Sequence, residues 1–218
     1  VLGIFISSKL SGTFESFVHT AKEVKNDLPN FRFAAIDSMT TCMEMGWPAI
    51  AAAKAAETGA SLDDCIQTAN TSLHSTRFVF APESLLFLQK GGRIGKAAAL
   101  IGNMISLTPV LTVNDGEAST FSKCRTQKKA LAKMLQVLGE DTAPSGLKNL
   151  VVHYIGSKAP AMQWAEEKVA PLIGFMPRVV PASPVIGVHV GPAMGIAYEC
   201  NAPIPNKFHN SEPEIIVC

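Results

Sequence analysis

The sequence predicts an α/β protein of two domains: a first domain built on a parallel sheet, and an α+β second domain whose sheet is mixed or antiparallel. Three observations predict this class. Strand, helix and strand patterns follow one another within residues 1–36, as in the βαβ unit of a parallel sheet. Hairpin and helix patterns alternate after residue 76, which is typical of α+β domains. The chain has 218 residues, enough for one large domain or two small ones.

The first domain is expected at residues 1–76. Residues 1–6 form a continuous apolar run, the pattern of a strand buried on both faces. Apolar residues then recur at helical spacing from Phe17 to Leu28, and residues 31–36 form a second strand. Two further helices complete the domain, the second preceded by the capping-box pair Ser61 and Asp64; they span residues 48–56 and 62–73.

The second domain is expected at residues 77–200, and an irregular tail rich in Pro and Asn at 201–218. The turn sequence Asn-Asp-Gly at 114–116 separates two strand patterns and therefore predicts a β-hairpin. The expected strands are 77–81, 107–113, 117–123, 149–155, 179–180 and 185–190, and the expected helices are 83–90, 126–138 and 159–172.

Composition and charge exclude several classes of protein. The net charge is +1, whereas nucleic-acid-binding proteins usually carry a clustered basic surplus. The chain is 47% hydrophobic and 17% charged, which excludes an acidic disordered protein. No apolar run is long enough for a membrane span, so we expect no stable membrane insertion. The five cysteines are scattered and odd in number, without metal-ligand spacing, which favours reduced thiols, a cytoplasmic location and no metal site.

A loop rich in hydroxyl groups follows the first strand. It reads Ser-Ser-Lys-Leu-Ser-Gly-Thr at residues 7–13, and it lies between the carboxyl end of a strand and the start of a helix. Ligands of open α/β sheets bind in that crevice, and the helix dipole there favours an anion. The loop lacks both common nucleotide-binding motifs, so Ser7, Ser8 and Ser11 are candidates for holding a small anion such as a carboxylate. The alternative is that they only cap the helix.

Other polar residues are further candidates for binding or chemistry, and one of them, Asp37, is a candidate for the same crevice. Asp37 follows the second strand, and it either joins the serine loop or caps a turn. His189 ends an expected strand before Gly-Pro, where it would either face a cleft or bond a turn carbonyl. His153 is flanked by apolar residues, which favours a structural role. The cations Arg93 and Arg125 would either meet a phosphate or an acidic partner, or form a solvated basic face.

Serine, histidine and aspartate occur together, so a serine- and histidine-dependent acyl transferase or hydrolase is an alternative function. The sequence has no Gly-x-Ser-x-Gly elbow, however, and the order of these residues matches no triad arrangement.

Six motifs occur in the order found in one family. They are Ile-Ser-Ser-Lys-Leu-Ser-Gly-Thr-Phe at 6–14, Ile-Asp-Ser at 36–38, Leu-Gln-Lys-Gly-Gly-Arg-Ile-Gly at 88–95, Thr-Pro-Val-Leu at 108–111, Arg-Thr at 125–126 and Gly-Val-His-Val-Gly-Pro at 187–192. With these motifs the chain resembles the DegV family of bacterial fatty-acid-binding proteins, several of which are the acyl-carrying subunit of a fatty acid kinase. The resemblance runs from residue 1 to about Tyr198.

The resemblance implies a DegV-like two-domain fold with one long-chain fatty acid held between the domains, no further cofactor and no catalysis by this chain. A serine of the loop and the motif histidine would contact the carboxylate, here Ser8 (with Ser7 and Ser11 as alternates) and His189. A kinase partner would phosphorylate the carboxyl group, with Arg93 and Arg125 docking that kinase or meeting the phosphate. Family members begin with a further αβ segment carrying Asp-Ser-Thr and Thr-Ser-Gln-Pro motifs, which this sequence does not show.

Overall fold

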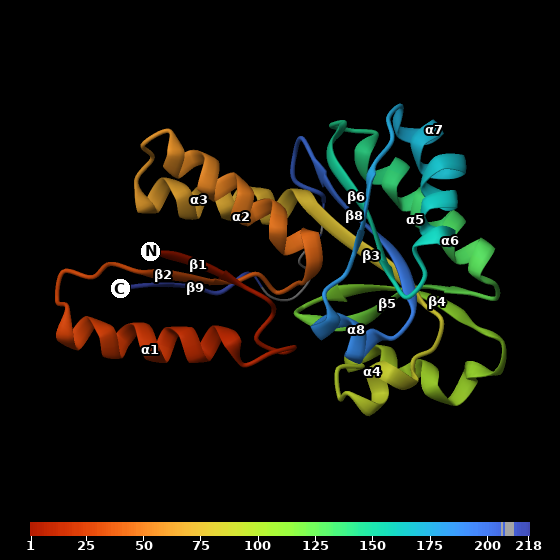
Figure 1. Cartoon of the computed structure of the whole chain (residues 1–218), viewed down its shortest axis with the longest axis horizontal. Helices are drawn as coiled ribbons and strands as arrows, with labels where there is room; N and C mark the ends of the chain where they lie inside the picture. The colour runs from red at the N-terminus through yellow and green to blue at the C-terminus, as the bar shows by residue number, and fades with distance from the viewer. Residues whose placement is uncertain (206, 208–211) are drawn as a thin grey trace.

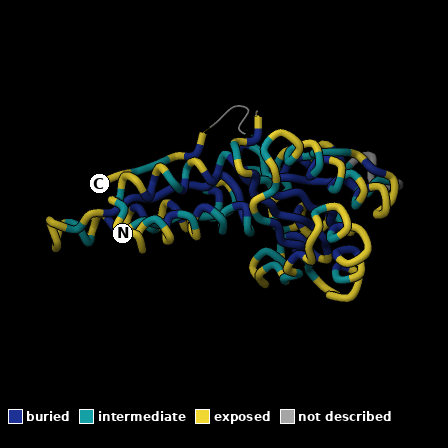
Figure 2. The backbone as a smooth tube through the Cα atoms, turned by 90° about the horizontal axis from the view of Figure 1, so that it is seen from above, coloured by how far each residue is buried: buried dark blue, intermediate teal, exposed yellow. Residues whose placement is uncertain are grey.

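The computed structural model describes residues 1–205, 207 and 212–218, with the backbone alone described at 102–106. The described strands form one sheet of three strands and one of six. Figure 1 shows the two sheets next to each other, each in a lobe of its own with helices packed against it. Figure 2 shows buried backbone running through the middle of both lobes, with exposed positions on the outer turns.

The smaller sheet begins with the predicted βαβ unit. Strand β1 (Leu2–Phe5) pairs in parallel with β2 (Ala34–Asp37), which confirms that prediction. Helix α1 (Thr13–Asp27) covers one face, and α2 (Cys42–Glu57) and α3 (Leu62–Ser75) cover the other (Figure 1). Alternate residues of a strand point to opposite faces, so β2 contributes to two cores, one against α1 and one against α2 and α3.

The end of the chain adds the third strand of this sheet. Strand β9 (Ile215–Val217) pairs antiparallel with β2, so the sheet is mixed, and the prediction of an irregular tail at 201–218 is wrong at these residues. The physical reason is that Ile215 and Ile216 pack against the two cores of β2. The prediction of an irregular tail followed from the Pro and Asn residues elsewhere in it and overlooked this short apolar run.

The larger sheet has the strand order β5-β4-β3-β8-β6-β7, in which the β6–β7 pair is parallel and the other pairs are antiparallel. This confirms the predicted mixed sheet. Its strands are β3 (Thr76–Pro82), β4 (Thr108–Asn114), β5 (Glu117–Cys124), β6 (Leu147–Ile155), β7 (Arg178–Pro181) and β8 (Ala193–Cys200). The predicted hairpin joins β4 to β5, and its two turn residues have positive φ, 51° at Asp115 and 79° at Gly116.

Helices cover both faces of the larger sheet. One face packs against α5 (Gln127–Thr142) and against the continuous run of α6 (Lys158–Trp164), η2 (Ala165–Val169) and α7 (Ala170–Ile173). The other face carries α4 (Leu86–Lys90), η1 (Gly95–Ser106) and α8 (Pro184–Val190), and it is turned toward the start of α2. The second face is the one that borders the candidate site.

Helix α8 and strand β8 also differ from the prediction. Residues 185–190, expected as a strand, lie in helix α8, because Ser183 accepts a hydrogen bond from the Ile186 amide and Pro184 starts the helix. The β-branched residues Val185 and Val188 suggested a strand, but in the helix both are largely exposed. The strand lies instead at β8, whose eight residues are all buried and for which the sequence analysis predicts no element.

Candidate functional site

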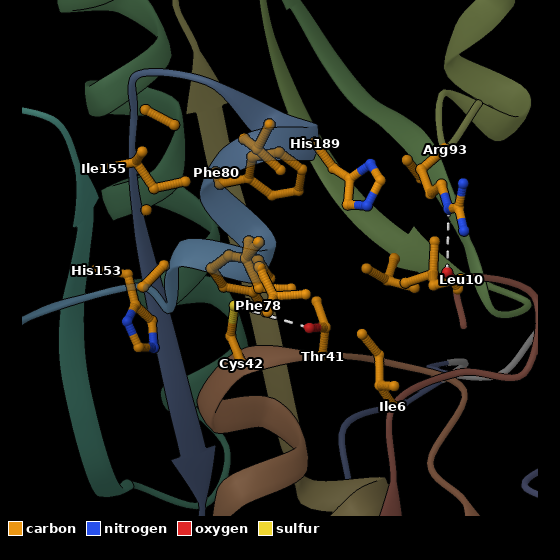
Figure 3. Close-up of a pocket in the computed structure, with 18 of the residues that line it drawn as sticks. Ile6, Leu10, Thr41, Cys42, Phe78, Phe80, Arg93, His153, Ile155 and His189 are labelled. Atoms are coloured by element: carbon orange, nitrogen blue, oxygen red, sulfur yellow. Dashed lines mark hydrogen bonds between the residues drawn. The ribbon is translucent and has the colours of Figure 1, made fainter. Parts of the chain in front are cut away.

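A mostly apolar cavity of about 260 Å³ lies where the smaller sheet's loops meet the larger sheet. The serine loop and the start of α2 form one side, and strands β3, β6 and β8 with helix α8 form the other. Figure 3 shows Phe78, Phe80 and Ile155 among its apolar side chains, with His189 and Arg93 toward one end. Such a cavity suits a ligand with a long apolar part and a polar group.

Two of the three candidate serines do not line this cavity. Ser7 is buried, and its hydroxyl donates to the carbonyl of Gly116 at 2.8 Å, at the tip of the β4–β5 hairpin. The Ser8 amide donates to the Asp37 carboxylate at 3.1 Å. Ser11 lines the cavity. The capping alternative is not what the structure shows, because α1 has Gly12 at its N-cap and no side-chain cap hydrogen bond.

The hairpin tip and the serine loop are joined by more than one contact. Besides the Ser7 bond, Lys9 Nζ donates to the carbonyl of Asp115 at 2.8 Å and lies 3.9 Å from Glu117 Oε1. Gly116 is required at the tip, because a Cβ there would lie 2.6 Å from the Ser7 hydroxyl oxygen. We call these contacts the hairpin clasp. They tie the two sheets together beside the cavity.

Asp37 organises the loop that leads into α2. It is buried, and its carboxylate accepts the amides of Ser8 and Met39, so it both contacts the serine loop and caps the turn after β2, the two alternatives that the sequence left open. Met39 and Cys42 both have a φ of 56°, an uncommon conformation for residues with a side chain. The turn brings Thr41 and Cys42 to the cavity wall.

His189 lines the cavity from the last turn of α8 rather than from a strand end. Its Nδ1 is buried and has no hydrogen-bond partner within the described part of the chain. A Cβ on Gly91 would lie 2.5 Å from that nitrogen, so the glycine leaves the space that the imidazole occupies. The imidazole thus packs against Gly91 with its Nδ1 edge.

The two candidate arginines lie in different surroundings. Arg93 lines the cavity; its Nε donates to the Leu10 carbonyl at 3.2 Å and its Nη1 to the Gly91 carbonyl at 2.8 Å. Figure 3 shows Arg93 beside Leu10, on the side of the cavity that the serine loop forms. Arg125 is exposed, between the end of β5 and the N-cap residue of α5, and it does not line the cavity.

Thr41 and Cys42 line the cavity although the sequence did not single them out, and His153 lines it although the sequence favoured a structural role. Burial lowers the pKa of His153 from 6.5 to about 4, although the backbone of Val180 raises it slightly, so the imidazole is neutral at pH 7. Burial likewise raises the pKa of the Cys42 thiol to about 11, despite a weak hydrogen bond from Thr41. Both groups are therefore uncharged in the cavity wall. The residue pattern of a single strand or turn gives no sign of which face borders a cavity.

Within residues 1–205, 207 and 212–218, no group of three or more His, Cys, Asp and Glu side chains could hold a metal ion. None of the helices described is both long enough and apolar enough to span a lipid bilayer.

A family model described as "Uncharacterised protein, DegV family" matches residues 1–201. The chain belongs to the DegV family. Among curated relatives, this DegV chain is 43% identical over 200 residues to a DegV domain-containing protein of Clostridium acetobutylicum. It is 36% identical over 200 residues to one of Clostridium perfringens. Each match covers 91% of this chain and 70% of the relative.

Solved DegV structures have the same fold. A fatty-acid-binding DegV family protein from Streptococcus agalactiae superposes with a TM-score of 0.80 at 25% identity. DegV from Bacillus subtilis, described as a fatty-acid-binding protein, gives 0.78 at 28% identity. Each comparison covers 92% of this DegV chain and 70% of the solved chain. The predicted DegV-like fold is therefore confirmed.

Proposed function

We propose that this DegV chain binds one long-chain fatty acid in the cavity and presents its carboxyl group to a partner kinase. The observation that carries the proposal is the composition of the cavity wall: aromatic and aliphatic side chains line most of it, and polar side chains that could hold a carboxylate, among them Ser11, Arg93 and His189, line it as well. Burying the hydrocarbon stabilises the complex by about 0.8 kcal/mol for each CH₂ group. The fatty-acid binding of the solved relatives supports the same function.

The carboxylate would lie at the end of the cavity where His189 and Arg93 are found. His189 and Arg93 both line the cavity, and among the described residues Arg93 donates to the neutral carbonyls of Leu10 and Gly91, so a carboxylate would gain charge-assisted hydrogen bonds there. Ser11 is the loop serine best placed to donate its hydroxyl. Ser7 and Ser8 take a supporting role in this proposal, because Ser7 holds the hairpin clasp and the Ser8 amide holds Asp37.

The kinase role rests on the exposed position of Arg125 and on Arg93 at the mouth. A kinase that transfers a phosphoryl group to the carboxylate oxygen creates further negative charge, which the Arg93 guanidinium would offset. Arg125 lies outside the cavity and is exposed, so we assign it to contact with the kinase. The fatty acid is then ligand and substrate together, and this chain supplies no catalytic residue. We place the protein in the cytoplasm, since five unpaired thiols are typical of a reducing compartment.

The experiment that tests binding is native mass spectrometry of the purified protein, followed by titration of the delipidated protein with stearic acid. We expect a stoichiometric fatty acid, and a loss of affinity of about tenfold in Ser11→Ala and His189→Ala. The surface variant His19→Ala is the matched control, because His19 is exposed on α1 and bonded only to its helix neighbour Glu23. Absence of any fatty acid binding by the wild-type protein would refute the proposal.

The kinase role has a separate test. Arg125→Glu should bind stearic acid like the wild type but form acyl phosphate more slowly when a fatty acid kinase is added. Equal rates of acyl phosphate formation in Arg125→Glu and wild type would remove the assigned contact and leave the binding proposal standing.

A further inference from the structure

His153 is a polar side chain in the apolar wall of the cavity. It lies on β6, is 7% exposed, and its ring meets the edge of the Phe78 ring at a centroid distance of 5.9 Å. In Figure 3 it lies on the opposite side of the view from His189 and Arg93. A fatty acid whose carboxylate is held by those two residues would therefore pass His153 with its hydrocarbon part.

The hydrogen-bonding capacity of His153 is largely unused. Nδ1 and Nε2 are both covered by protein, and neither makes a hydrogen bond of normal geometry within the described residues. Among the residues that the structure describes, the backbone of Val180 is the polar group that acts on the ring, and it can serve only one of the two nitrogens. At least one nitrogen is thus left without a partner, which is costly for a buried polar group.

The ring can offer a nitrogen to the cavity without moving its plane. His153 lines the cavity although both nitrogens are covered, so it meets the cavity with carbon atoms. A half-turn about the Cβ–Cγ bond exchanges the edge that carries Nδ1 with the edge that carries Cδ2, and the volume of the ring is unchanged. The turn gives up no more than the contact with Val180.

We propose that His153 is a specificity-determining residue that hydrogen-bonds a hydroxyl group on the hydrocarbon part of the ligand, so that the preferred ligand is a hydroxy fatty acid. This rests on the proposed fatty-acid binding. A neutral imidazole has one donor and one acceptor nitrogen, and a hydroxyl group can satisfy either of them. An all-methylene chain covers the ring and satisfies neither. The discrimination expected from one such hydrogen bond is about tenfold in affinity.

The test compares stearic acid with a series of hydroxystearic acids that differ only in the position of the hydroxyl group. Each is titrated into the delipidated wild-type protein and into His153→Leu, His153→Gln and the control His19→Leu. We expect at least one isomer to bind the wild type about tenfold more tightly than stearic acid does. His153→Leu should abolish that ratio, His153→Gln should retain part of it, and His19→Leu should leave it unchanged.

The ratio of two affinities separates specificity from a general structural role, because loss of structure would weaken both ligands together. If the wild type binds no isomer more tightly than stearic acid, the inference is wrong whether or not the variants fold. A preference that persists in His153→Leu would also overturn it. If stearic acid and all isomers fail to bind, the proposed function fails and this inference fails with it, whereas equal binding of all of them refutes only this inference.

Discussion

Replacing Lys207 by methionine removes one half of a buried ion pair that fixes the tail to the smaller lobe. The Lys207 and Glu44 side chains are 6% and 2% exposed, and Lys207 Nζ lies 3.1 Å from Glu44 Oε1. Lys207 also donates to the Thr76 hydroxyl at 3.0 Å and to the Leu73 carbonyl. Burial lowers the pKa of Lys207, and the charge of Glu44 opposes that shift, so the pair is held together against desolvation.

The magnitude follows from the charge left behind. Lys207→Met leaves the Glu44 carboxylate buried, with the Thr40 hydroxyl as its remaining donor among the described residues, and breaking such a pair typically costs about 3–5 kcal/mol of the free energy of unfolding. With a urea m-value of about 3 kcal/mol/M, the unfolding midpoint should fall by about 1–2 M. The assay is urea unfolding followed by circular dichroism.

The matched control is Lys133→Met, since Lys133 is exposed on α5 and bonds only the Gln136 side chain. Its free energy of unfolding should stay within about 0.5 kcal/mol of the wild type. The double variant Glu44→Leu with Lys207→Met removes both charges, so it should be more stable than Lys207→Met alone. An unchanged midpoint in Lys207→Met, or simple addition of the two single effects in the double variant, would refute the reasoning.

Three further predictions concern the cavity. Between pH 6.5 and about 4 the unfolded state binds a proton at His153 that the folded state excludes, so stability should fall by about 3 kcal/mol as the pH is lowered, and His153→Leu should lack this component in urea titrations. Ser7→Ala should lose about 1–3 kcal/mol of stability with little change in fatty acid affinity, whereas Ser11→Ala should show the reverse in unfolding and binding assays. Gly91→Ala places a Cβ 2.5 Å from His189 Nδ1, displaces the imidazole and should weaken binding of stearic acid about tenfold in calorimetry.

Each of these has an outcome that contradicts it. The free energy of unfolding could show the same dependence on pH in the wild type and in His153→Leu. That result would mean that the environment of His153 is more polar than the cavity wall. A Ser7→Ala variant that is stable but no longer binds fatty acid would indicate that Ser7 contacts the carboxylate. Gly12→Ala is the control for Gly91→Ala, because a Cβ at Gly12 meets no atom within 4 Å, and equal losses in both variants would exclude a steric effect on His189.

The local patterns predicted the smaller lobe better than the cavity wall. The βαβ unit was recognisable because β2 is buried on both faces and α1 has a clear apolar stripe. The hairpin was recognisable because Asp115 and Gly116 must both adopt positive φ. These features depend on neighbours in the sequence, and so the sequence shows them.

Elements whose character depends on distant partners were harder to predict. Strand β8 has small residues and a buried Glu199, and it becomes a central strand only because β3 and β6 flank it. Helix α8 resembles a strand in composition, yet Ile186 and Val190 are spaced one helical turn apart on its cavity side. His189 was correctly expected at a cleft although its element was not. The sequence predicts only a structural role for His153, because the pattern of a single strand does not show what its inner face contacts.

The placement of β9 bears on the order in which the chain can fold. Strand β2 pairs with β1, which is close to it in the sequence. Its other edge pairs with residues 215–217, and nearly the whole chain lies between these two segments. Such long-range closure is slow relative to local pairing. During synthesis the smaller sheet would therefore spend most of its time with one edge uncovered. The amides that β9 protects should be among the last to gain protection in refolding and among the first to exchange with solvent in the native protein.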